Sequence, residues 1–332
     1  MIYLFLYLCV LLSTFPKSAQ GKSGAICNST GAKDILTEDR PINDKYDVRP
    51  NLFIDRDNLL GKTSHDHKKE FSYGNGPYGC AHWPKLFPKC GGKHQSPINI
   101  DIANLKTITL PNLKWNNLYE EIPEKMSVSN THNTLVLEMV YNGNHRPRIS
   151  GGPLTKPYSL KSLHFHWSSS DHKGSEHTIS KKSFPMEMHV VHYRSDLNFS
   201  NAAVLDKGLC VIAYIFEISN DKCNDALTSI LSVAEENTME KDIEVDLTNL
   251  FRLDSLVDTI DSEYVTYSGS LTTPPCHESV IWIISPYTIT IAKKQIERFR
   301  QISMASGGFG DNHRPIQPLN DRVVNFVKSN KQ

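Results

Sequence analysis

The chain has 332 residues, of which 39% are hydrophobic, and this is enough to bury the core of one large domain. Its 36 Lys and Arg residues match its 36 Asp and Glu residues, so the formal net charge is zero. Because no basic patch interleaved with aromatic residues occurs, we expect neither nucleic acid nor an acidic membrane surface as a partner.

The N-terminal segment has the pattern of a secretory signal peptide. Residues 2–12 are almost wholly apolar, and the small residues in Ser18-Ala19-Gln20-Gly21 offer a cleavage site. The apolar run is shorter than the ~20 residues that cross a bilayer. We therefore predict a signal peptide over residues 1–21 and a secreted, extracellular protein, with an uncleaved anchor as the alternative. The polar tail, residues 329–332, predicts no membrane anchor.

Residues 22–69 are rich in charged residues, Asn and Asp, and lack a sustained apolar period. This composition predicts a loosely ordered polar arm, for which Cys27 is the one available tether.

The remaining segment, residues 70–328, is predicted to form one domain of short elements. Runs of β-branched and other apolar residues predict strands over 134–140, 211–218 and 279–284. Helical spacing of apolar residues predicts helices over 225–233 and 292–302. No internal repeat divides the segment.

Two histidines separated by one residue, His164 and His166, are predicted to point to the same face of a strand. His189 follows after enough chain for a turn and a return strand, and Glu187 shares its face. A histidine on an apolar strand is more often a buried core residue than a ligand. Three imidazoles with a carboxylate beside one of them nevertheless favour a catalytic zinc site with an open fourth position.

Four further segments accompany these histidines in a fixed order. They are Gln95-Ser96-Pro97-Ile98-Asn99-Ile100, Gly174-Ser175-Glu176-His177-Thr178, Gly269-Ser270-Leu271-Thr272-Thr273-Pro274-Pro275 and Asp311-Asn312-His313-Arg314-Pro315-Ile316-Gln317-Pro318-Leu319. From about Phe71 to about Val327 the chain resembles α-class carbonic anhydrases of the secreted, eukaryotic type.

The resemblance implies a mainly β (α+β) fold, with a large, twisted, mostly antiparallel central sheet and short peripheral helices in a single domain. It implies a zinc enzyme that reversibly hydrates carbon dioxide to bicarbonate and a proton, using zinc-bound hydroxide. The cofactor would be Zn²⁺, and the small-molecule partners would be CO₂ and bicarbonate.

The same resemblance assigns roles to individual residues. His164, His166 and His189 would hold zinc, while Glu187 and the backbone carbonyl of Asn312 would orient two of the rings. Ser162 stands where the family commonly has a Gln that orients the first ring. His177 and His192 match buried structural histidines.

The remaining assignments concern the reaction itself. Thr272 and Glu176 would form a hydroxyl-to-carboxylate relay, and His132 would carry the proton to buffer. Leu135 replaces a polar residue that the family often has near this histidine. The other positions would form the substrate pocket and the water network: Val191, Val211, Leu271, Thr273 and Trp282 for the pocket, and Tyr73 and Asn130 for the water.

Six cysteines remain once Cys9 leaves with the signal peptide, and an even number in an exported protein suggests disulfides. The resemblance implies a bond between Cys90 and Cys276. Cys210 lies in an apolar strand and is expected to be a buried free thiol. A bond between Cys80 and Cys223 would leave Cys27 free or joined to another chain.

Other features depend on export or on the resemblance. Asn28-Ser29-Thr30 and Asn198-Phe199-Ser200 are glycosylation sequons. The family pattern also implies cis peptide bonds at Ser96-Pro97 and Pro274-Pro275.

Two other functions deserve comparison. A catalytically silent binding module of this fold would usually lack a zinc histidine, and here all three are present. A mineral-matrix protein would be expected to contain acidic or Gly/Asn repeats, which the sequence lacks.

Overall fold

The computed structural model describes residues 71–131, 133–220, 223–236, 243–305 and 310–329. The predicted signal peptide, the polar arm, Cys27 and the Asn28 sequon lie outside these residues, as does His132. Their structural predictions therefore stay predictions.

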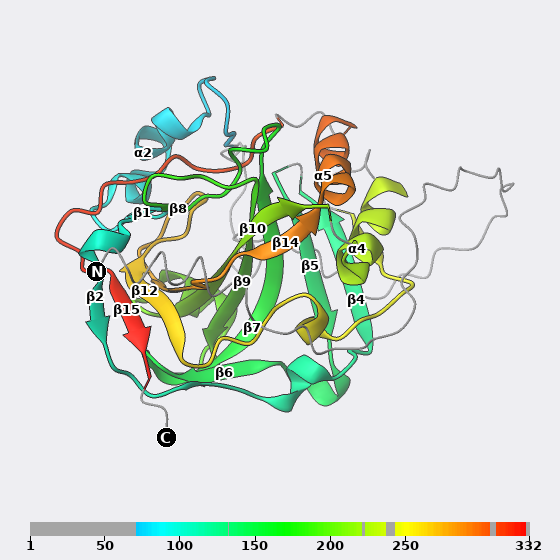
Figure 1. The fold of residues 1–332 in the computed structure, drawn as a ribbon, viewed down its shortest axis with the longest axis horizontal. Helices are drawn as coiled ribbons and strands as arrows, with labels where there is room; N and C mark the ends of the chain where they lie inside the picture. Colours follow the sequence, from blue (N-terminus) through cyan, green and yellow to red (C-terminus); the bar gives the residue numbers. More distant parts are fainter. Residues whose placement is uncertain (1–70, 132, 221–222, 237–242, 306–309, 330–332) are drawn as a thin grey trace, which may run out of the picture.

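A large mixed sheet of 13 strands dominates the described part of the chain (Figure 1). Its main path runs in the order β11-β4-β5-β7-β9-β10-β13-β12-β15-β2, while β14 pairs with β10, and β6 joins β3 to β7. The strands are β2 (Lys106–Ile108), β3 (Leu113–Trp115), β4 (Lys125–Asn130), β5 (Leu135–Val140), β6 (Arg148–Gly151), β7 (Leu154–Trp167), β9 (Met186–Arg194), β10 (Leu209–Ser219), β11 (Glu244–Asp246), β12 (Glu263–Gly269), β13 (Val280–Ile284), β14 (Ile289–Ala292) and β15 (Asn325–Lys328).

Most neighbouring strands in this sheet are antiparallel. The parallel pairs are β10 with β13, β10 with β14, and β15 with β2. A separate pair, β1 (Asn99–Ile100) with β8 (Thr178–Ile179), is also parallel. The predicted mainly β class, with one large and mostly antiparallel sheet, is confirmed.

The helices are short and lie outside the sheet. They are α2 (Trp83–Leu86), α3 (Phe199–Val204), α4 (Asp225–Glu236) and α5 (Lys293–Ala305), together with the 3-10 turns η1 (Cys80–His82), η2 (Pro88–Gly91), η3 (Ile102–Asn104), η4 (Asn117–Glu120), η5 (Asn142–Asn144) and η6 (Leu253–Ser255). Within the described residues, no helix is long and apolar enough to cross a membrane.

Helices α4 and α5 lie side by side on one flank of the molecule (Figure 1). A polar side chain of α5 holds the start of α4, because Gln295 Nε2 donates to the Asn224 carbonyl over 2.7 Å and to Thr228 Oγ1 over 2.9 Å. The buried face of α4 includes Leu227, Ile230 and Leu231, which follow the helical spacing of the sequence.

Both predicted helices and all three predicted strands are present as α4, α5, β5, β10 and β13. Strand β10 is longer than expected, since it pairs with β9 on one side and with β13 and then β14 on the other. These partners supply backbone hydrogen bonds along its whole length.

The alternation of side chains along β7 places the site. Leu163, Phe165 and Trp167 belong to the larger hydrophobic core, which also contains the buried faces of α4 and α5. His164 and His166 alternate with them and therefore lie on the opposite face of the sheet. That face carries a second core, which includes Val191, Val211, Leu271 and Trp282.

Cys90 and Cys276 are bonded, with a Cα–Cα distance of 4.8 Å, and Cys210 is a buried free thiol. The pairing of Cys80 with Cys223 was wrong: Cys80 is free, whereas Cys223 is disulfide-bonded. Cys80 begins η1 and packs in the cluster of Trp83, Cys90 and Cys276. The Ser96-Pro97 and Pro274-Pro275 bonds are cis, as expected.

Candidate metal centre

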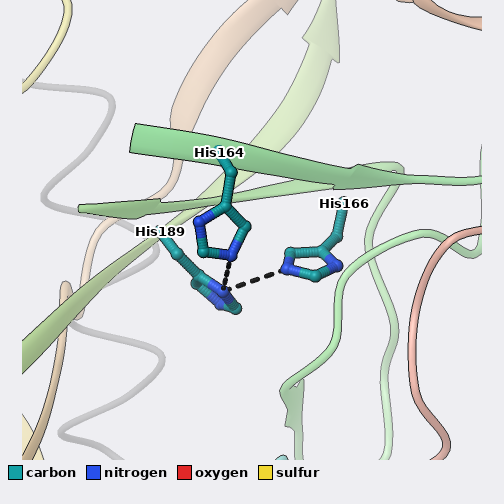
Figure 2. Close-up of side chains that lie close together, drawn as sticks. All are labelled: His164, His166 and His189. Carbon is teal, nitrogen blue, oxygen red and sulfur yellow. Dashed lines mark hydrogen bonds between the residues drawn. The ribbon is translucent and has the colours of Figure 1, made fainter. Parts of the chain in front are cut away.

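Strands β7 and β9 place three histidines together. The antiparallel register sets His164 opposite His189 and His166 opposite Glu187. Figure 2 shows the three imidazole rings converging, with the His189 ring linked to both of the others. His189 Nδ1 lies 3.1 Å from His166 Nε2 and 3.3 Å from His164 Nε2, and all three side chains are buried.

The outer nitrogens of two rings have hydrogen-bond partners that can only accept. His166 Nδ1 donates to the backbone carbonyl of Asn312 over 2.8 Å. His189 Nε2 donates to the Glu187 carboxylate over 2.7 Å. In neutral rings these donors leave lone pairs on His166 Nε2 and His189 Nδ1, the two nitrogens that face each other.

Burial keeps all three rings neutral. It lowers the pKa of His166 to about 4 and that of His164 well below the usual value. Burial also lowers the pKa of His189, aided by the neighbouring His166 ring and opposed by Glu187. Neutral imidazole is the form that binds metal ions.

Zinc fits this donor set. Two lone pairs only 3.1 Å apart cannot share a hydrogen bond, so a cation between them removes the conflict. Tetrahedral Zn²⁺ with bonds of about 2.0–2.1 Å requires ligand nitrogens about 3.3–3.4 Å apart, close to the observed separations. The three nitrogens also satisfy the spacing of a metal-binding group.

Glu187 orients more than one histidine. Its Oε1 accepts from His189 Nε2 and from His177 Nδ1, each over 2.7 Å, and its Oε2 accepts from the His177 backbone over 2.8 Å. Burial would raise the pKa of the Glu187 carboxyl, but His177 and His189 hold that pKa well below its usual value. The carboxylate therefore remains a charged acceptor that fixes the His189 tautomer.

A second carboxylate, that of Glu176, lies beside the three nitrogens. Its Oε2 is 3.4 Å from His166 Nε2, and its Oε1 accepts from the Arg314 backbone over 2.8 Å. Burial raises the pKa of Glu176, while the nearby His189 and the Thr272 hydroxyl act in the opposite direction. The structure thus brings Thr272 and Glu176 together beside the candidate metal centre.

Comparison with known proteins identifies the family of this chain. A family model described as eukaryotic-type carbonic anhydrase matches residues 78–328. The chain belongs to this family. It is 37% identical over 254 residues to carbonic anhydrase 7 of Mus musculus, covering 74% of this chain and 93% of that protein.

Other members of the carbonic anhydrase family are similar over nearly the same extent. Carbonic anhydrase 15 of Mus musculus is 34% identical over 259 residues, covering 74% of this chain and 79% of that protein. The carbonic anhydrase-related protein of Homo sapiens is 32% identical over 255 residues, covering 72% of this chain and 85% of that protein.

An apolar wall occupies the same face of the sheet as the candidate metal centre. Val211 on β10 is in register with Val191 on β9 and with Trp282 on β13. Leu271 belongs to the same buried cluster, and the Trp282 ring packs edge-on against His189 at a centroid distance of 4.9 Å. Thr273 follows Leu271 by two positions and is half-buried. Among the described residues, no contact shows its side chain to be part of this wall.

The proposed water-network residues lie in two places. Asn130 is buried at the end of β4, where it pairs with Leu135. Tyr73 is half-buried and packs edge-on against Phe71 and Trp83 near the disulfide. His132, the expected proton carrier that this water would serve, lies outside the described residues.

Ser162 lies on β7 two residues before His164, and its Oγ has no hydrogen-bond partner among the described residues. His177 and His192 are buried and take part in other hydrogen bonds. His177 Nε2 bonds to the Tyr267 hydroxyl over 2.8 Å, and His192 Nε2 bonds to the Tyr119 hydroxyl over 2.5 Å.

The sequence did not single out Tyr267 or Thr134. The Tyr267 hydroxyl bonds both His177 and Ser96, which belong to two of the segments that carry the family resemblance. That shared partnership was the only sign in the sequence that could have pointed to Tyr267. Thr134 bonds the backbone of Phe165, and no sequence pattern indicated this contact.

Proposed function

We propose that this protein is a secreted zinc enzyme that reversibly hydrates carbon dioxide to bicarbonate and a proton. The observation that carries this proposal is the pair of facing lone pairs on His166 and His189, fixed by Asn312 and Glu187, with His164 beside them. When bound, zinc lowers the pKa of water to about 7, a value known from carbonic anhydrases themselves, and so supplies hydroxide at neutral pH.

The relay beside the centre would select and orient the reacting oxygen. The Glu176 carboxylate accepts from the Arg314 backbone, and the Thr272 hydroxyl lies close enough to oppose part of the rise in the pKa of Glu176 that burial causes. A Thr272 hydroxyl that donates to Glu176 can only accept from the reacting oxygen. That oxygen must therefore carry a hydrogen, and its lone pair is left to face the carbon of CO₂.

The apolar wall suits an uncharged substrate. Val191, Val211, Leu271 and Trp282 offer CO₂ a dry surface beside the centre, with Thr273 proposed at its edge. His132 would then take the proton that each turnover leaves behind, through water ordered by Tyr73 and Asn130. An imidazole suits this role because its unperturbed pKa of ~6.5 lies near ambient pH.

We propose that the protein is exported from the cell. The Cys90–Cys276 disulfide is typical of proteins folded in an oxidising compartment. In the sequon at Asn198, that residue is exposed and its Oδ1 accepts from the Asn201 backbone over 2.8 Å to cap α3. A glycan attached at Nδ2 would keep this acceptor, so the cap and the modification are compatible.

Expression in a secreting eukaryotic host tests the location. We expect protein in the medium that begins after residue 21 and loses mass on treatment with an N-glycosidase. Asn198→Gln should remove the part of that loss due to this sequon. Protein retained inside the cell with its N-terminus intact would contradict export.

The decisive experiment on function is a CO₂ hydration assay of purified protein before and after zinc removal by a chelator. We expect one zinc per chain, activity that disappears with the metal, and recovery on zinc addition. A catalytically silent member is the alternative, favoured by the similarity to a protein named only as carbonic anhydrase-related. Protein that carries zinc without hydrating CO₂ would support that alternative.

A further inference from the structure

The turn between β4 and β5 ends at a residue that contacts the metal-binding strand. Thr131 N donates to the Thr134 carbonyl over 3.0 Å, and Thr134 N donates to Thr131 Oγ1 over 3.1 Å, which closes the turn. The Thr134 side chain is buried, with 8% of its surface exposed. It is therefore directed into the protein toward β7.

The Thr134 hydroxyl bonds both backbone groups of one residue of β7. Its oxygen accepts from Phe165 N over 3.0 Å and donates to the Phe165 carbonyl over 2.5 Å. The β5–β7 ladder pairs Leu137 with Leu163 and Val136 with His164, and its register does not continue to Phe165. The hydroxyl thus replaces the backbone partner that the ladder would have supplied.

Asn312 holds the same stretch from another segment of the chain. Its Nδ2 donates to the Phe165 carbonyl over 3.0 Å, and its Oδ1 accepts from Trp167 N over 2.6 Å. Its carbonyl accepts from the His166 ring. His164 has no comparable support, because among the described residues its buried Nδ1 has no hydrogen-bond partner.

We propose that Thr134 is a positioning residue for the metal centre. Phe165 lies between His164 and His166, so any rotation of its peptide groups would change the angle between the two ligand rings. By bonding both Phe165 N and Phe165 O, the Thr134 hydroxyl fixes that angle. His164 depends on this most, since its Nδ1 has no hydrogen-bond partner among the described residues to orient the ring from behind. The inference rests on the proposed zinc centre.

Thr134→Val tests the proposal, because valine is close to threonine in shape but has no hydroxyl to bond the Phe165 backbone. We expect zinc to dissociate about ten-fold faster, the lower end of the ~10- to 100-fold effects seen for groups behind metal ligands. The release is followed by transfer to a chromophoric chelator. The visible spectrum of the cobalt-substituted variant should also shift, while Thr134→Ser, which keeps the hydroxyl, should match the wild type in both measurements.

Thr228→Val is the matched control. The Thr228 hydroxyl also makes two bonds, to the Asn224 carbonyl over 3.1 Å and from Gln295 Nε2 over 2.9 Å, but it lies in α4 away from the centre. We expect this variant to lose stability and to release zinc at the wild-type rate. Unchanged zinc release from Thr134→Val would overturn the proposal, as would an equal acceleration in Thr228→Val.

Hydrogen exchange in the wild-type protein does not depend on whether a variant folds. The Phe165 amide should exchange slowly because Thr134 accepts its hydrogen, and exchange at the rate of an open loop would overturn the proposal. If the wild-type protein fails to bind one zinc per chain, the proposed function itself is contradicted. Normal zinc uptake by the wild type, together with a wild-type rate of zinc release from Thr134→Val, would contradict this inference and leave the proposed function standing.

Discussion

Ser162 Oγ and His164 Nδ1 are both buried, and neither has a hydrogen-bond partner among the described residues. The two residues are separated by one position on β7 and so share a face. The rings of His166 and His189, by contrast, each donate to a fixed acceptor. His164 is therefore the least supported of the three candidate ligands.

Ser162→Gln is expected to tighten zinc binding or leave it unchanged, because the longer amide can reach the ring nitrogen that serine does not. Changes behind a metal ligand typically alter affinity by about 10- to 100-fold. Competition with a chelator of known affinity measures the change, and Ser162→Ala serves as the control without a polar group. A marked loss of affinity in Ser162→Gln would show that Ser162 already makes a contact that the amide disrupts.

His189→Ala should lose most of the metal affinity and nearly all CO₂ hydration. His189 Nδ1 is the nitrogen that lies within 3.1 and 3.3 Å of the other two rings, so its removal opens the donor set. Elemental analysis after dialysis measures the bound zinc. His192→Gln is the control for loss of a buried histidine from the same strand, and full zinc occupancy in His189→Ala would mean that the ligand set is wrong.

The sequence predicted that His164, His166 and His189 would lie close together, because the two-residue period of a strand fixes which side chains share a face. It also predicted Glu187 as the partner of His189, because the two residues share a strand face, whereas Asn312 was expected as the partner of His166 only through the family resemblance. The contact of Thr134 with Phe165 was not predictable, because it joins segments 31 positions apart whose relative register depends on the folded sheet.

Cysteine pairing showed the same limit. Sequence spacing gave no information on whether Cys80 could reach Cys223, and the suggested bond was wrong. The Cys90–Cys276 bond was expected only because the family pattern supplied it. Pairings depend on three-dimensional proximity, which composition and periodicity do not encode.

Removal of the Cys90–Cys276 bond should destabilise the protein strongly. The two cysteines are 186 positions apart, and a chain-entropy estimate for a loop of this length is about 5 kcal/mol, as an upper limit. The double variant Cys90→Ser with Cys276→Ser should therefore unfold at much lower urea concentration. Cys80→Ser, which alters a free thiol, is the control, and equal unfolding midpoints in both variants would contradict the prediction.

The stability of the metal-free protein should fall on acidification below about pH 6.5. Burial lowers the pKa of His192 to about 3. Between these two values the unfolded chain binds a proton at this residue and the folded chain does not, so stability rises with pH across the window. Within it, each pH unit of acidification costs about 1.4 kcal/mol for one such histidine.

Urea unfolding at several pH values with a chelator present measures this slope. His192→Gln should give a smaller dependence on pH, because the group that titrates differently in the two states is gone. Its stability at pH 7 should also be lower, since the Tyr119 hydroxyl loses its acceptor. A slope identical to that of the wild type would show that other groups cause the acid sensitivity.

His132→Ala is expected to lower kcat while leaving kcat/KM nearly unchanged. The attack on CO₂ precedes the transfer of the proton to buffer, so the loss of a proton carrier slows only the later step. Imidazole buffers of small size should restore much of the rate, because they can accept the proton directly. Leu135 is buried at a position where the family often has a polar residue, so it offers no group to order water. We therefore expect proton transfer through water to be less effective in the natural protein. The loss of kcat in His132→Ala should therefore be smaller than in a protein whose proton carrier works efficiently. Equal losses of kcat and kcat/KM that imidazole does not rescue would show that His132 maintains the structure of the site instead of carrying the proton.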